Sequence, residues 1–109
     1  MFKIASETTF AHTVKVMIPV DGGHQAADFR ATFRVLPSDR EKAFDLGTPE
    51  GSDGFLRAVF VGADDVAGDD GQALPWSDEL RDRLLQVPFV RTALTRTYFR
   101  AVQKAAEGN

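Results

Sequence analysis

Two runs of alternating hydrophobic and polar residues lie in the first third of the chain. From His12 to Val20, hydrophobic residues recur at every second position, as in a β-strand with one buried face. Between Phe29 and Val35 the same alternation returns, after the turn-forming residues Asp21-Gly22-Gly23. The pattern therefore predicts a β-hairpin. Met1 to Ile4 are expected to add a short edge strand.

The middle of the chain combines turn-forming residues with short hydrophobic runs. Pro37 ends the second strand, and Ser38-Asp39-Arg40-Glu41 has the form of a capping box, which predicts a short helix to about Leu46. The segment from Gly47 to Gly54 consists of residues that are typical of turns. In Phe55 to Val61 the hydrophobic spacing favours a helix, but the β-branched end of this run leaves a buried strand as the alternative.

Two helices are expected in the last third, after an acidic loop from Gly62 to Gly71. Ser77 is a suitable N-cap for a helix from about Asp78 to Gln86, whose first turn holds acidic residues where the helix dipole favours them. Pro88 interrupts that helix because proline cannot donate the helical hydrogen bond. A longer helix then extends from Phe89 to about Ala106, a segment without Gly or Pro.

Together these elements predict a single α+β domain over residues 1–109. An antiparallel sheet built on the N-terminal hairpin region (about 1–36) packs against three or four helices in a mainly helical region (about 38–106), and the C-terminal helix is the longest. A chain of 109 residues with 43% hydrophobic residues is long enough for one compact domain and too short for two.

Composition and charge exclude several classes of protein. The chain has no cysteine, which rules out disulfides, thiolate zinc sites, iron–sulfur clusters and a cysteine nucleophile. A net charge of -3 argues against nucleic acid as a partner. The N-terminus has no signal-peptide pattern, and no segment approaches the roughly 20 apolar residues of a membrane span. We therefore expect an intracellular protein with no nucleic acid and no membrane among its partners.

No motif identifies a catalytic, cofactor or metal site. The Gly-rich motifs that bind phosphates and dinucleotides are missing, as is the nucleophile elbow of hydrolases. The aspartates between Gly62 and Gly71 do not have the spacing of an EF-hand loop, and neither His12 nor His24 belongs to a zinc-ligand pattern. We expect no catalytic residues, no cofactor and no bound metal.

Charged residues are unevenly distributed along the chain. Residues 39–79 hold eleven acidic and three basic residues, whereas residues 80–104 hold six basic residues and one acidic residue. In the last helix Arg96, Arg100 and Lys104 recur every four residues and form a basic stripe with Phe99 at its edge. Such a stripe is either a solvated helix face or a binding surface. The charge asymmetry can likewise steer one copy onto another or be closed within one monomer.

A family resemblance runs through most of the chain and is strongest in its C-terminal half. There an acidic turn with Asp-Gly, a small helix, a proline break and a final helix follow one another. With the N-terminal hairpin, this order resembles the small tail assembly chaperones of long-tailed bacteriophages and related prophages. The residues that carry the resemblance in this half are Asp69-Asp70-Gly71-Gln72-Ala73-Leu74-Pro75-Trp76-Ser77, Glu79-Leu80, Leu84-Leu85, Val87-Pro88-Phe89-Val90-Arg91-Thr92-Ala93-Leu94, Tyr98 and Gly108-Asn109.

The resemblance implies a non-catalytic protein of the host cytoplasm, absent from the mature virion. It would bind the long helical tape measure protein and keep it soluble during tail assembly, by covering apolar helical stripes. Self-association is also expected. The alternative is a structural tail component, such as a tail terminator or head–tail connector subunit, that forms a ring. The candidate protein-binding residues are Phe89, Arg96, Phe99, Arg100 and Lys104.

Overall fold

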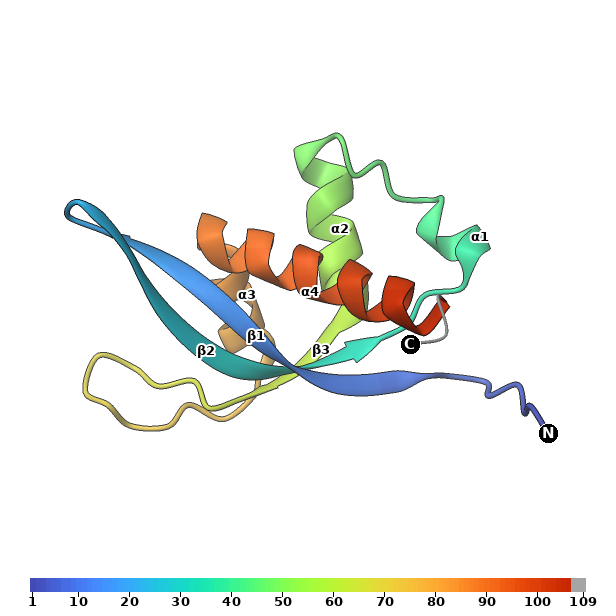
Figure 1. The fold of residues 1–109 in the computed structure, drawn as a ribbon, viewed down its shortest axis with the longest axis horizontal. Coiled ribbons are helices and arrows are strands. Elements are labelled where there is room, and N and C mark those ends of the chain that lie inside the picture. Colours follow the sequence, from blue (N-terminus) through green and yellow to red (C-terminus); the bar gives the residue numbers. More distant parts are fainter. Residues whose placement is uncertain (107–109) are drawn as a thin grey trace.

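The computed structural model describes the backbone of residues 1–106 and the side chains of residues 1–103. Its elements follow in the order β1, β2, α1, α2, β3, α3 and α4 (Figure 1). Three antiparallel strands form one sheet in the order β1-β2-β3, and helices α2 and α4 lie on one side of it. The α+β fold expected from the sequence, with its N-terminal hairpin and long C-terminal helix, is confirmed.

The hairpin consists of β1 (Thr9–Val20) and β2 (Gly23–Arg34), which pair along their whole lengths. Asp21 and Gly22 make the turn, and Gly22 has a φ of 78°, which favours glycine. The predicted edge strand at Met1–Ile4 is wrong, because this segment has no regular structure. Its backbone has no strand to pair with: β1 takes up pairing only at Thr9.

The first helix is shorter than predicted. Helix α1 (Ser38–Glu41) is a single turn rather than a helix to Leu46. Pro37 stands at the N-cap position and Ser38 is the first helical residue, so the capping box does not form and no side chain caps this helix.

Helix α2 (Pro49–Val59) begins six residues earlier than expected, within the segment that was predicted as turns. The Thr48 hydroxyl accepts a hydrogen bond from the Gly51 N–H at 3.0 Å, and Pro49 occupies the first helical position. Gly51 is required by close packing, since a Cβ there would lie 1.9 Å from the Asp45 carbonyl oxygen.

Both alternatives for residues 55–61 are realised in part, because the helix ends at Val59 and β3 (Phe60–Asp64) follows directly. Strand β3 pairs with β2, placing Phe60 beside Phe33, and the register shifts between Thr32 and Phe33. The strand is stabilised by this pairing with a distant segment, which local periodicity does not reveal.

The last two helices agree with the prediction. Helix α3 (Asp78–Leu85) is capped by Ser77, whose hydroxyl accepts a hydrogen bond from the Leu80 N–H at 3.0 Å. Helix α4 (Pro88–Ala106) begins at the proline that separates the two helices and is the longest helix of the described chain.

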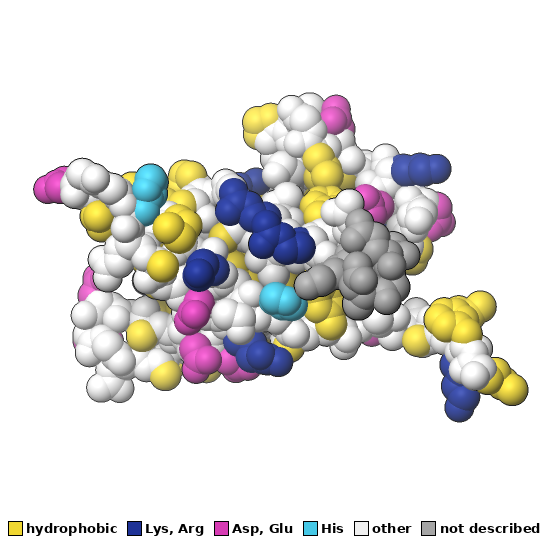
Figure 2. Space-filling view, in the orientation of Figure 1, with side chains coloured by type: hydrophobic (Ala, Val, Ile, Leu, Met, Phe, Trp, Pro, Cys, Tyr) yellow, Lys and Arg dark blue, Asp and Glu magenta, His cyan; other side chains and the backbone are white. Residues whose placement is uncertain are grey.

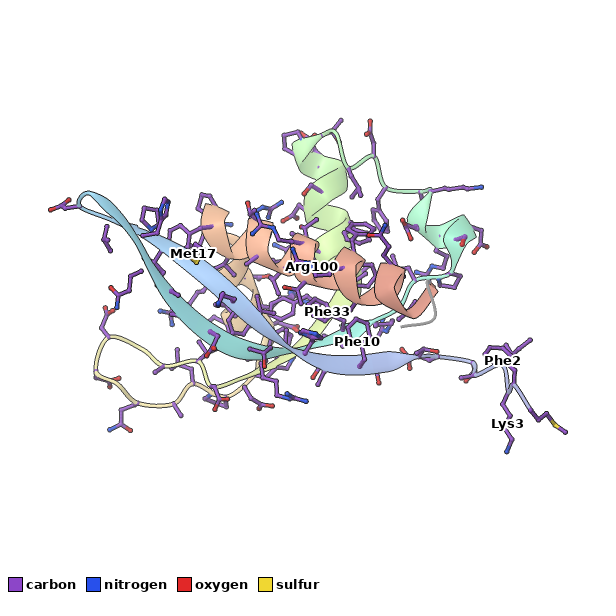
Figure 3. All side chains as sticks on the ribbon, in the orientation of Figure 1. Phe2, Lys3, Phe10, Met17, Phe33 and Arg100 are labelled. Carbon is purple, nitrogen blue, oxygen red and sulfur yellow. The ribbon has the colours of Figure 1, made fainter. Side chains whose placement is uncertain are left out.

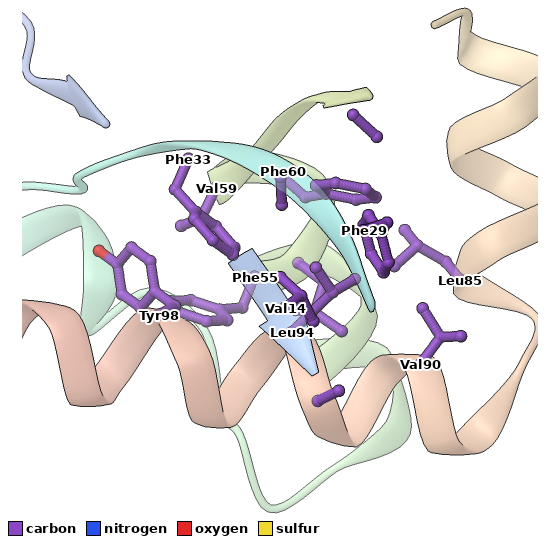
Figure 4. Packing of buried hydrophobic residues seen from close by; sticks show 14 of the residues in the cluster. Val14, Phe29, Phe33, Phe55, Val59, Phe60, Leu85, Val90, Leu94 and Tyr98 are labelled. Carbon is purple, nitrogen blue, oxygen red and sulfur yellow. The ribbon is translucent and has the colours of Figure 1, made fainter. Parts of the chain in front are cut away.

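The core lies between the sheet and the helices (Figure 4). Tyr98 is at its centre, 1% exposed, and its ring packs edge-on against Phe55 with centroids 5.3 Å apart. Its hydroxyl accepts a hydrogen bond from the Leu36 N–H at 3.2 Å, which ties α4 to the chain after β2. Figure 4 labels the main contributors: Val14, Phe29, Phe33, Phe55, Val59, Phe60, Leu85, Val90, Leu94 and Tyr98.

Candidate protein-binding surfaces

A basic groove runs between the edge strand β1 and helix α4, and we call it the α4–β1 groove. It has a volume of about 380 Å³. Figure 2 shows Lys and Arg side chains gathered over these two elements, and Figure 3 labels Arg100 on α4 and Met17 on β1. The residues that line the groove are His12, Thr13, Lys15, Met17, Ala93, Arg96, Thr97, Arg100 and Ala101.

The positive charge of this groove is not neutralised within the described chain. None of its lining residues is acidic, and Lys15, Arg96 and Arg100 take part in none of the ion pairs among the described residues. Asp28 stands opposite Lys15 in the hairpin register but forms no ion pair with it. The groove can therefore attract an anionic group from another molecule.

The five candidate binding residues on α4 differ in their exposure: two are exposed, two are half-buried, and the side chain of the fifth is outside the described part of the chain. Arg96 and Arg100 are exposed and line the groove. Phe89 and Phe99 are half-buried and pack against the core, and the Phe99 ring stacks on another core ring at a centroid distance of 5.3 Å. The side chain of Lys104 lies outside the described residues. The structure thus brings together the two arginines and directs the two phenylalanines toward the core.

A second surface is the end of the hairpin, residues 17–26, which we call the arm. It projects beyond the helices (Figure 1), and every residue in it is exposed except Ile18, which is half-buried. The core-facing side of β1 continues onto this arm. The exposed fraction of the residues on this side of β1 rises toward the arm, from 0% at Val14 and 5% at Val16 to 45% at Val20. Ile18 still packs against the edge of the core, whereas the apolar side chain of Val20 is exposed beyond it.

An ion-pair network holds the three helices of the core together. Arg57 on α2 bonds Asp53 at 2.7 Å and Asp82 of α3 at 2.6 Å, and Arg91 of α4 reaches Asp53 at 3.1 Å. Hydrogen bonding from Arg57 lowers the pKa of both aspartates below their ordinary value of 3.8. Both carboxylates are therefore ionised near neutral pH, and their bonds to the arginines join α2, α3 and α4.

The described part of the chain offers no arrangement suited to metal binding, because it contains no group of three or more His, Cys, Asp or Glu side chains placed to hold an ion. Within the same residues no helix is both long enough and apolar enough to cross a membrane.

His12 and Lys15 belong to the groove but were not predicted as binding residues. Both lie within the first alternating run, and Lys15 occupies one of the exposed positions that alternate with the buried valines of β1. Their proximity to Arg96 and Arg100 depends on the packing of β1 against α4, about 80 residues apart in the sequence. The alternation could show that Lys15 is exposed, but not which helix lies beside it.

Comparison of the chain with protein-family models, with curated proteins and with solved structures finds no match.

Proposed function

We propose that this chain is a non-catalytic tail assembly chaperone of a long-tailed phage or prophage. It binds the tape measure protein in the host cytoplasm, keeps it soluble while the tail forms, and is absent from the mature virion. The observation that carries the proposal is the apolar stripe of β1, which passes from the core onto the arm through the half-buried Ile18 and ends at the exposed Val20.

This stripe suits a helical partner that has not yet been assembled. Apolar side chains at every third or fourth position form a stripe along such a helix, and the stripe needs a cover until the helix reaches its final neighbours. The arm offers a matching apolar surface on a rigid, fully paired hairpin. Because that surface is small, several copies are needed along one long partner.

Co-expression with the tape measure protein of the same phage tests the proposal. The unaltered chain should keep the tape measure protein in the soluble fraction. The double variant Ile18→Asp, Val20→Asp places two charges on the apolar side of the arm and should leave the partner insoluble. The matched control His24→Asp, Ala26→Asp places two charges on the other side of the same arm, as the pairing register indicates, and should preserve solubility. Equal solubility with both double variants would refute the assignment of the arm.

The alternative function, a structural tail component, makes a different prediction about the finished particle. A tail terminator or connector subunit persists in the virion, whereas the proposed chaperone leaves before the particle is complete. Mass spectrometry of purified virions distinguishes the two, and recovery of this chain in stoichiometric amounts would favour the structural role.

A further inference from the structure

The segment after β3 forms an ordered acidic finger, residues 66–74. Its two sides are joined by hydrogen bonds from the Leu74 N–H to the Val66 carbonyl at 2.8 Å and from the Gly68 N–H to the Gln72 carbonyl at 3.0 Å. The tip is the turn Gly68–Gly71, closed by a hydrogen bond of 2.9 Å, and Gly71 has a φ of 77°.

The tip presents two adjacent carboxylates. Asp69 and Asp70 occupy its central positions, and both are exposed. The hydrogen bond that the Asp70 carboxylate accepts, from the Gln72 N–H at 2.9 Å, fixes that side chain. Among the described residues no cation pairs with either aspartate. The hydrogen-bonded turn therefore holds the backbone of both aspartates, and the side chain of Asp70 is fixed as well, which reduces the entropy lost when the tip binds.

The α4–β1 groove has the complementary features. Arg96 and Arg100 lie about one helical turn apart, about 6 Å along the axis, and Lys15 of β1 lines the same groove. Arginine binds carboxylates through paired N–H donors, so two neighbouring arginines can each take one aspartate of the tip.

We propose that the acidic tip of the finger docks in the α4–β1 groove of a second copy of this chain. The contact is not made within one molecule. The finger follows β3 at one edge of the sheet, the groove lies at the opposite edge beside β1 (Figure 1), and no described ion pair joins them. This contact goes beyond the proposed function and uses neither Ile18 nor Val20, so the arm stays free for its own partner.

The contact joins two different surfaces, so each chain has one finger and one groove to offer. Such a head-to-tail contact adds copies in one direction and gives either a closed ring or an open filament. Exposed ion pairs are individually weak and are screened by salt, so the association is expected to be strong at low ionic strength and lost at high ionic strength.

Sedimentation velocity with charge-reversed variants tests this pairing. One variant reverses the groove (Arg96→Glu, Arg100→Glu) and the other reverses the tip (Asp69→Lys, Asp70→Lys). Each variant alone brings like charges together and should remain monomeric under conditions in which the unaltered chain associates. An equimolar mixture restores both complementary pairs, groove of one with tip of the other, and should associate again.

The remaining outcomes overturn the proposal. The first is that the unaltered chain stays monomeric at about 0.01 M ionic strength, where the Debye length is about 30 Å. The second is that either charge-reversed variant associates as strongly as the unaltered chain. The third is that the mixture of the two variants stays monomeric. The variant Asp39→Lys, Glu50→Lys, at two exposed acidic positions away from the finger, has the same net charge as the tip variant and should associate like the unaltered chain.

Two further measurements keep the result interpretable. Circular dichroism verifies that each variant is folded, and Arg96→Gln, Arg100→Gln replaces the groove variant if glutamate disturbs α4; it should also be monomeric. The arm variant Ile18→Asp, Val20→Asp should still associate. If only the tip–groove contact is wrong, the charge variants associate like the unaltered chain while the arm variant still loses the tape measure protein. If only the proposed function is wrong, the charge variants lose association but the unaltered chain does not keep the tape measure protein soluble.

Discussion

The Tyr98 hydroxyl is the polar atom through which α4 holds the chain that leaves β2, and Tyr98→Phe removes it while keeping the ring. The ring contacts, including the edge-on contact with Phe55 at 5.3 Å, are retained. The Leu36 N–H, in a residue that is 6% exposed, loses its partner at 3.2 Å. Leaving a buried donor unpaired costs about 1–3 kcal/mol. Because 3.2 Å is at the long end of the hydrogen-bond range, we expect a loss of about 1–2 kcal/mol.

Urea unfolding followed by the fluorescence of Trp76, which packs on Phe60 at 5.0 Å, measures this loss. The midpoint should fall while the dependence of the unfolding free energy on urea stays the same, because the exposed area hardly changes. The melting temperature should fall by roughly 5–10 °C. A variant as stable as the unaltered chain would mean that the Leu36 N–H gains nothing from the hydroxyl.

Tyr98 should also make the stability of the protein depend on pH in the alkaline range. Burial raises the pKa of Tyr98 above its ordinary value of 10.0, and the charge of Glu41 adds to this effect, whereas the hydrogen bond from Leu36 opposes it. A raised pKa means that the folded state holds the proton more tightly. Stability is therefore complete below pH 10 and declines as the pH rises further. Tyr98 is the one tyrosine of the chain, so tyrosinate absorbance reports it directly, and Tyr98→Phe should show a smaller alkaline loss.

Two more predictions concern the helices. The hydrogen bond from Arg57 is the main cause of the lowered pKa of Asp53. The ionised carboxylate therefore stabilises the fold above pH 3.8, and this stabilisation is lost as the pH falls below that value. Arg57→Gln should reduce this acid dependence of the unfolding free energy. Gly51→Ala should destabilise the protein by about 1–3 kcal/mol in thermal unfolding, because the new Cβ would lie 1.9 Å from the Asp45 carbonyl oxygen. Alanine favours helices more than glycine does, so an increase in stability would contradict this close packing.

Elements specified by local pattern could be predicted from the sequence. The hairpin follows from period-two alternation, α3 from the Ser77 cap and the start of α4 from Pro88. The beginning of α2 could not be predicted in the same way. Glycine is typical of turns, but Gly51 lies in the first turn of α2, where the absence of a Cβ lets the helix approach the backbone of Asp45. Its role depends on a tertiary contact.

The candidate site shows the same division. The spacing of Arg96 and Arg100 identifies a basic stripe on α4, and the structure places both residues in the groove. Phe99, at the edge of that stripe in the sequence, instead stacks on Phe55, because the neighbouring helix α2 offers a ring there. Lys15 joins the groove through the packing of β1 on α4. The exposed stripe of the arm could not be inferred either, since hydrophobic alternation does not show where the covering helices end.

We propose above that this chain binds the tape measure protein and keeps it soluble. The most direct test of this proposal is size-exclusion chromatography with light scattering on the soluble fraction of cells that express both proteins. We expect one peak whose mass equals the tape measure protein plus several copies of this chain. Elution of this chain alone, as a closed ring, with the tape measure protein in the pellet, would contradict it.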